Sequence, residues 1–351
     1  MLSGEQIIEI REHLERSQNP VFFFDNDIDG LMSFIILRRY IGRGKGVAIK
    51  SFPELDANYS HKVDEFNADY VFILDKPVVS QGFIDEVYRK NIPIIWIDHH
   101  DVGNNVARSG EKNISYYNPV FSKDKSNEPI SYISYKISGR KEDMWLAIAG
   151  CLGDNFMPEF LEDFVKEYPG LWKKDIQSAF QALYESDFGK IIQILAFALK
   201  DRTSNVVYMI NFLISVKSPN DILFENEKNF KIISRYKQIN KTYLKLLEKA
   251  KKIARSSRKV IFFQYSGDLS ISADLANELS YRFPGKIIIV AYVKGGTANL
   301  SVRGRIDVRK ITLDAIKNIE GATGGGHEHA TGCKIPAGQL LKFKEFFDNA
   351  V

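Results

Sequence analysis

The chain has 351 residues, which is long enough for two domains that each have their own hydrophobic core. Its 44% hydrophobic and 26% charged residues are typical of a soluble globular protein, and a formal net charge of +4 is too small to indicate a nucleic-acid partner by itself. The two cysteines, Cys151 and Cys333, match no metal-binding or disulfide pattern. Residues 1–6 do not resemble a signal peptide, and no apolar run approaches the roughly 18 residues of a membrane span. We therefore expect a cytoplasmic protein.

The first hundred residues alternate between predicted strands and predicted helices. The expected strands lie at 21–24, about 46–52, 70–74 and 92–97, and the expected helices at 4–17, 31–40, 59–67 and 79–90. Such alternation predicts an α/β fold in which a parallel sheet carries helices on both faces.

Beyond residue 101 the pattern becomes helical and then returns to alternation. Helices are expected at 128–138, 143–154, 158–166, 171–199 and about 226–256, followed by strands at 259–265 and 286–293 and helices at 271–282, 310–319 and 337–349. The helix ending near 256 would be about 45 Å long at 1.5 Å per residue, which suits a connection between domains. We predict a catalytic domain at 1–217, a linker with the long helix at 218–257, and a smaller α/β domain at 258–351.

Three of the predicted strands end in carboxylate or imidazole side chains. The strand at 21–24 runs into an acidic turn, the strand at 70–74 is followed by a single acid, and the strand at 92–97 ends in an acid and two histidines. In chain order these residues are Asp25, Asp27, Asp29, Asp75, Asp98, His99 and His100. Because ligands of open α/β folds collect at the carboxyl edge of the sheet, we expect the active site there.

Clustered carboxylates repel one another unless a positive charge lies between them, so the acidic turn at 25–29 indicates a bound cation. Imidazole and carboxylate ligands together suit manganese, iron or zinc. The alternative for the acidic turn is a helix N-cap supplied by Asp29. Asp75 and Asp154 alone are equally compatible with a turn and a helix cap. An EF-hand is excluded, because a strand precedes the turn and the twelfth loop position falls near Leu37 instead of a glutamate.

Two features of the last hundred residues suggest phosphate binding. Gly324, Gly325 and Gly326 allow close approach of a ligand to the backbone, with His327 beside them. Arg303 and Arg305 follow a predicted strand and are suited to clamping phosphate oxygens. A flexible loop and ordinary surface arginines are the alternatives.

Five short motifs together resemble the DHH phosphoesterase family, and specifically its RecJ-like nuclease branch. They are Asp-Asn-Asp-Ile-Asp-Gly at 25–30, Leu-Asp at 74–75, Asp-His-His at 98–100, Gly-Asp-Asn at 153–155 and Gly-Gly-Gly-His at 324–327. The resemblance covers nearly the whole chain and keeps the order of the family's motifs. It implies an N-terminal DHH domain and a C-terminal DHH-associated domain.

The resemblance also implies roles for individual residues. Two manganese ions, with Mg²⁺ or Co²⁺ as alternatives, would be held by Asp27, Asp29, Asp75, His99 and Asp154, with Asp75 as the bridge. His100 would contact the scissile phosphate and Asp98 would support the histidines. The substrate strand would be held by Arg303, Arg305, Gly324, Gly325, Gly326 and His327.

The implied activity is hydrolysis of single-stranded DNA or RNA, or of short oligonucleotides, to nucleoside monophosphates. Two cations about 3.5 to 4 Å apart can activate a water and offset charge on the attacking and leaving oxygens. Two other expectations are a small-nucleotide phosphodiesterase or phosphatase, and an inactive scaffold with a replication or repair partner. The chain departs from the family at Phe23, where many members have histidine, and at Glu328, where proline is usual. Asp25 is the candidate to compensate at the first metal.

Overall fold

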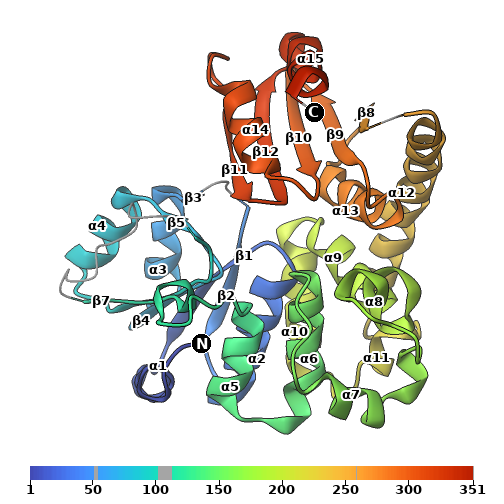
Figure 1. Ribbon diagram of the computed structural model, residues 1–351. Helices are drawn as coiled ribbons and strands as arrows, with labels where there is room; N and C mark the ends of the chain where they lie inside the picture. The colour runs from blue at the N-terminus through green and yellow to red at the C-terminus, as the bar shows by residue number, and fades with distance from the viewer. Residues whose placement is uncertain (51–53, 102–112, 258, 351) are drawn as a thin grey trace. The chain divides into compact units, whose positions relative to one another are not determined.

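A computed structural model describes residues 1–50, 54–101, 113–257 and 259–350 (Figure 1). The chain forms two compact units, Met1–Tyr236 and Lys237–Val351. None of the helices in these described stretches combines the length and the apolar character that crossing a membrane requires.

The first unit contains a sheet of five parallel strands in the order β2-β1-β4-β6-β7. Their bounds are β1 Pro20–Asp25, β2 Lys45–Ile49, β4 Tyr70–Leu74, β6 Ile94–Ile97 and β7 Ile114–Tyr117. A separate two-stranded pair joins β3 Glu54–Leu55 to β5 Val78–Val79. The predicted parallel sheet is confirmed, and β7 adds an edge strand that the sequence pattern did not predict.

Side chains of the parallel strands alternate between two apolar layers, as expected for a sheet buried on both faces. On β1, Phe22 and Phe24 belong to one hydrophobic cluster and Phe23 belongs to the other. The stacked rings of Phe22 and Phe72 and of Phe24 and Phe34 lie in the first cluster. This packing fixes the position of the carboxyl end of each strand. It therefore also fixes the positions of the residues that follow.

Helices supply the remainder of the first unit. They are α1 Gly4–Arg16, α2 Ile28–Ile41, α3 His61–Glu65, α4 Gln81–Arg89, α5 Ile130–Ser138, α6 Met144–Gly153, α7 Leu161–Glu167, α8 Ala179–Glu185, α9 Asp187–Leu199, α10 Thr203–Ser215 and α11 Asn220–Leu223, and α12 Phe230–Ser256 continues into the second unit. α2, α5 and α6 pack against one another and contribute to the cluster that contains Phe22.

The prediction of one continuous helix over 171–199 was wrong. A 3₁₀ turn at Pro169–Leu171 is followed by α8 and α9, which are separated at Ser186. The Ser186 hydroxyl accepts a hydrogen bond from the Gly189 N–H at 2.9 Å and donates to the Ala182 carbonyl at 2.6 Å. A side-chain oxygen that caps the next helix stops the first one, although the apolar spacing continues across the break.

A buried arginine of α2, Arg39, links this helix to α6 and α10. Arg39, near the end of α2, forms an ion pair of 2.5 Å with Asp143, the residue before α6, and also donates to the Leu213 carbonyl at 2.6 Å. The side chain of Asp143 is fully buried and that of Arg39 is 8% exposed. Removing Asp143 would leave the Arg39 guanidinium buried without this partner, whereas Asp143 also pairs with Arg140 at 2.9 Å. The Arg39–Asp143 contact holds α2 against α6.

The second unit has a mixed sheet in the order β11-β12-β10-β9-β8. Its strands are β8 Val260–Ser266, β9 Ile287–Lys294, β10 Thr297–Arg303, β11 Thr323–His327 and β12 Ala330–Pro336, with helices α13 Ser272–Arg282, α14 Val308–Ile316 and α15 Leu340–Ala350. β8 and β9 pair in parallel and the other neighbours pair antiparallel. A smaller α/β C-terminal unit was predicted, and this expectation is confirmed.

Candidate metal centre

Asp75 lies immediately after β4 in a backbone conformation that restricts which residue can replace it. Its φ angle of +58° is in the left-handed region, where aspartate and asparagine are tolerated better than most residues. The Asp75 N–H donates to the Ile97 carbonyl at 2.9 Å, and the residue is 1% exposed. The end of β4 therefore fixes the carboxylate beside the end of β6.

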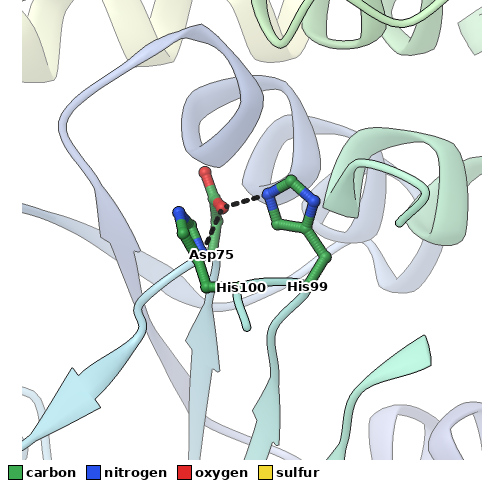
Figure 2. Close-up of side chains that lie close together, drawn as sticks. All are labelled: Asp75, His99 and His100. Carbon is green, nitrogen blue, oxygen red and sulfur yellow. Dashed lines mark ion pairs between the residues drawn. The ribbon is translucent and has the colours of Figure 1, made fainter. Parts of the chain in front are cut away.

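His99 follows β6 and meets two of the predicted carboxylates. Its Nε2 lies 3.3 Å from Oδ1 of Asp75 and 3.1 Å from Oδ2 of Asp154. Figure 2 shows the His99 ring directed at Asp75, with His100 on the other side of that carboxylate. Asp154 follows α6, and its N–H donates to the Gly150 carbonyl at 3.2 Å.

Asp29 belongs to the first turn of α2 and reaches across to the start of α5. Its two carboxylate oxygens accept hydrogen bonds from the N–H groups of Ile130 at 2.6 Å and Ser131 at 2.9 Å. A helix N-terminus stabilises negative charge, which helps to keep this buried carboxylate in place. A Cβ at Gly150 of α6 would lie 3.0 Å from Oδ1 of Asp29 and 2.3 Å from Oγ of Ser131, so only glycine allows the close approach.

Four side chains converge so that one ligand atom from each lies within 4.8 Å of all the others. They are Asp29, Asp75, His99 and Asp154. The first three are buried and Asp154 is exposed, which leaves the group open to solvent on one side. Three carboxylates and an imidazole suit a divalent transition ion, and the compact grouping fits one such ion.

The electrostatics of the carboxylates also favour a bound cation. Burial and the charge of Asp154 together raise the pKa of Asp29 to about 6, against the opposing effects of His99 and Ser131. Burial and the charges of Asp27 and Asp29 raise the pKa of Asp75 well above its usual value. Burial alone lowers the pKa of His99, but its contacts with Asp154 and Asp75 outweigh burial and raise it. A divalent cation would relieve this repulsion and displace the protons.

Asp27 lies outside this group of four among the described residues. Its Oδ1 accepts a hydrogen bond from the Gly30 N–H at 2.9 Å, which makes Asp27 the N-cap of α2. The expectation that Asp29 would cap this helix was therefore wrong. Burial and the charges of Asp25, Asp154 and Asp29 together raise the pKa of Asp27 to about 8. Asp27 is therefore close enough to Asp29 and Asp154 for their charges to raise its pKa. Its role as a metal ligand stays a prediction.

Phe23, the departure from the family pattern, and Asp25, the candidate to compensate for it, have separate environments. Phe23 is fully buried and packs edge to face against Phe83, so it is part of the core and offers no ligand. Asp25 forms an ion pair of 2.9 Å with the Nζ of Lys76.

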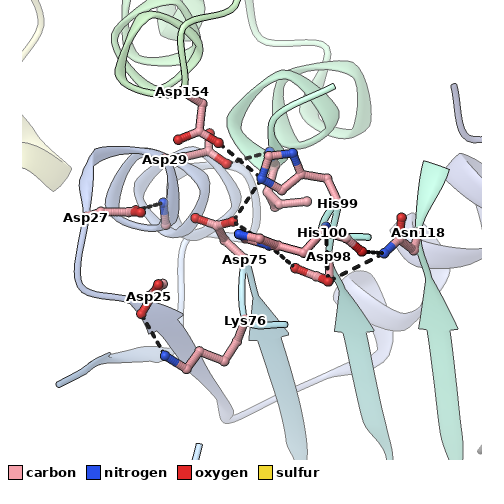
Figure 3. Close-up of polar contacts among 12 residues, drawn as sticks. Asp25, Asp27, Asp29, Asp75, Lys76, Asp98, His99, His100, Asn118 and Asp154 are labelled. Atoms are coloured by element: carbon pink, nitrogen blue, oxygen red, sulfur yellow. Dashed lines mark hydrogen bonds and ion pairs between the residues drawn. The ribbon is translucent and has the colours of Figure 1, made fainter. Parts of the chain in front are cut away.

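His100 is held by a polar network at the end of β6, shown in Figure 3. Its Nδ1 lies 2.8 Å from Oδ1 of the fully buried Asp98. The Asn118 amide donates to the His100 carbonyl at 3.0 Å and to the Tyr116 hydroxyl at 2.9 Å, and it lies 3.4 Å from Oδ2 of Asp98. Asp98 therefore orients His100, and its role in supporting both histidines for catalysis stays a prediction.

We expect Asn118→Ala to slow turnover roughly 10- to 100-fold, as is typical when an outer partner of a reactive side chain is removed. The substitution loosens Asp98 and His100 but leaves the group of four in place, so affinity for Mn²⁺ should stay at the wild-type value. Steady-state kinetics and Mn²⁺ titration of the same preparations check both parts. Equal loss of turnover and Mn²⁺ affinity would contradict a role limited to His100.

The predicted phosphate-binding residues all lie in the second unit. Most of β11, an edge strand, is formed by Gly324, Gly325, Gly326 and His327, so the alternative of a flexible loop was wrong. A Cβ at Gly326, whose φ is +136°, would lie 2.6 Å from the Ala330 carbonyl oxygen. Arg303, at the end of β10, donates to Oδ1 of Asn277 at 2.6 Å and to the Thr331 carbonyl at 3.2 Å, while Arg305 is exposed after the strand.

Residues 257–351 match the DHHA1 domain family model. The structure of RecJ in complex with Mn²⁺ from Thermus thermophilus is similar over 97% of this chain and 53% of that chain, with 14% identity and a TM-score of 0.67. An exonuclease RecJ bound to manganese is similar over 99% of this chain and 94% of that chain, with 15% identity and a TM-score of 0.64. The chain has the fold of the RecJ-like DHH proteins. It spans about half the length of the Thermus thermophilus protein.

A similar fold also occurs in a protein that is named for a different substrate. A pGpG-specific phosphodiesterase, PggH from Vibrio cholerae, is similar over 93% of this chain and 97% of that chain, with 12% identity and a TM-score of 0.50. No curated protein sequence matches the chain.

Three residues of this region were not predicted from the sequence: Lys76, Tyr116 and Asn118. Lys76 directly follows Asp75, so a charged residue at the buried end of a strand was the available signal. Tyr116 and Asn118 lie at the end of β7, a strand that the pattern did not predict, and no motif distinguishes them.

Proposed function

We propose that the chain is a metal-dependent phosphoesterase, and that it is an exonuclease on single-stranded DNA or RNA or on short oligonucleotides, releasing nucleoside monophosphates. The observation that carries the proposal is the convergence of Asp29, Asp75, His99 and Asp154, with His100 beside Asp75. Manganese is the proposed ion, since both RecJ structures named above contain it.

A bound divalent ion would lower the pKa of a coordinated water toward about 7 and offset negative charge on the phosphate. The chain's own contribution is positioning. The Asp29 carboxylate is fixed by the N-terminus of α5, Asp75 by its hydrogen bond to the end of β6, and His100 by Asp98. The His100 ring, which Asp98 holds through Nδ1, would contact a phosphate oxygen of the substrate.

The likeness to an exonuclease along 99% of this chain supports a nucleic-acid substrate. The likeness to a pGpG-specific phosphodiesterase supports a second candidate, hydrolysis of a linear or cyclic dinucleotide. Both reactions cleave a phosphodiester, and they differ in substrate length. If the substrate were instead a nucleoside bisphosphate, the second candidate would be a phosphatase.

A silent scaffold with a replication or repair partner is the remaining alternative. The four-residue group argues against it, because buried carboxylates with raised pKa values are costly to keep without a chemical role. The partner itself stays a prediction, as does the cytoplasmic location.

Purified protein should be incubated with end-labelled single-stranded DNA and RNA from dinucleotides to about 30-mers, with Mn²⁺ or with a chelator. We expect Mn²⁺-dependent loss of mononucleotides from one end, giving a ladder that the chelator abolishes. Cleavage confined to dinucleotides would favour the second candidate. Intact substrates at every length, in a preparation that binds Mn²⁺, would contradict both enzymatic proposals.

A further inference from the structure

A buried lysine stands directly beside the candidate metal centre. Lys76 follows Asp75, its side chain is 1% exposed, and its Nζ lies 2.9 Å from Oδ1 of Asp25 (Figure 3). Its carbonyl accepts a hydrogen bond of 2.8 Å from Nε1 of the buried Trp96. The hydrogen bond from Trp96 fixes the backbone of Lys76, and the side chain extends to Asp25 in the acidic turn.

Burying an ammonium is unfavourable unless a negative partner compensates it. Among the described residues, Asp25 is such a partner. It is the first acid of the turn that leads into α2, and its side chain is 28% exposed. A simple surface pair would leave the lysine in water, where ion pairs contribute little. The chain instead withdraws the lysine from solvent to deliver positive charge to this turn.

Two carboxylates of the acidic turn, Asp25 and Asp27, are left over once the group of four has been assigned to one ion. Asp25 is paired with Lys76, and Asp27 binds the N-terminus of α2. A second divalent ion in this region would have to compete with the ammonium for Asp25 and would be repelled by it. An ammonium has no lone pair, so Lys76 cannot itself be a ligand.

We propose that Lys76 supplies, at Asp25, the positive charge that a second metal ion would otherwise supply, so that the chain binds one divalent ion where a two-ion centre was expected. The inference rests on the proposed metal centre and goes beyond it by assigning the number of ions and a residue that determines it. Lys76 acts here through Asp25 and is a positioning residue for the acidic turn.

The test is a calorimetric titration of the metal-free full chain with MnCl₂, followed by electron paramagnetic resonance of the loaded protein. The wild type should bind one Mn²⁺ per chain and give the spectrum of an isolated ion. Lys76→Met, similar in length but uncharged, should free Asp25 and raise the stoichiometry twofold, to two ions with a spin-coupled spectrum. Lys90→Met is the matched control, because Lys90 also pairs with an aspartate, Asp64 at 2.7 Å, in another part of the unit. It should keep one ion.

Two ions in the wild type would overturn the inference and leave the metal centre standing. One ion in both the wild type and a folded Lys76→Met would overturn it as well, because the lysine would then not determine the number. No bound ion in the wild type would overturn the metal centre and the inference together. If Lys76→Met does not fold, the wild-type stoichiometry and spectrum still decide between one ion and two.

Discussion

Asp75→Asn is expected to reduce phosphodiester hydrolysis by far more than the roughly 10- to 100-fold that loss of an outer partner costs, because it removes a ligand of the ion itself. Asparagine is the informative replacement, since residue 75 has a φ of +58° and asparagine tolerates the left-handed region. Alanine there would combine loss of the ligand with backbone strain. The rate of hydrolysis under single-turnover conditions measures the loss of activity. A thermal melt of the same sample measures any loss of stability.

The matched control for this variant is Asp64→Asn, which changes an acid that is 63% exposed and pairs with Lys90. It should retain wild-type turnover. A folded Asp75→Asn protein with turnover within a few-fold of wild type would contradict the assignment of Asp75 to the metal centre.

Saturation with Mn²⁺ is expected to stabilise the protein strongly, because the ion relieves repulsion among buried carboxylates that the unfolded chain does not have. At a free concentration of 100 times Kd the stabilisation is about 2.7 kcal/mol. For a unit of this size each kcal/mol corresponds to about 2 to 4 °C in Tm. Differential scanning calorimetry with Mn²⁺ and with chelator measures the shift.

The same scan with Asp75→Asn separates specific from non-specific stabilisation. The variant should melt at nearly the same temperature with Mn²⁺ and with chelator, since the ligand set is broken. A full shift in the variant would mean that Mn²⁺ binds elsewhere in the chain, and would contradict the proposed location.

Most of the first unit's sheet could be predicted from sequence, because strands buried on both faces are continuous apolar runs and each ends abruptly in a polar residue. The break at Ser186 could not, since the apolar spacing of α8 and α9 continues through it and a single hydroxyl decides the outcome. The edge strand β11 was likewise missed, because a run of three glycines carries no strand pattern and forms one only by pairing with β12.

The candidate site could be predicted where a side chain follows a strand end directly, as for Asp75 and His99. Asp27 and Asp29 were harder, since both lie in one short turn and only the structure distinguishes the N-cap from the residue that meets His99 and Asp154. Lys76 was passed over for a different reason. Lysine is rarely buried, so the residue type alone indicated the surface.

The central claim is that Asp29, Asp75, His99 and Asp154 together hold one divalent cation. Anomalous diffraction at the manganese edge, from crystals of the full chain grown with MnCl₂, tests it most directly. We predict a single strong peak within about 2.0 to 2.3 Å of one ligand atom from each of the four residues. A map with no peak among these four side chains, while Mn²⁺ is bound elsewhere on the chain, would contradict the account.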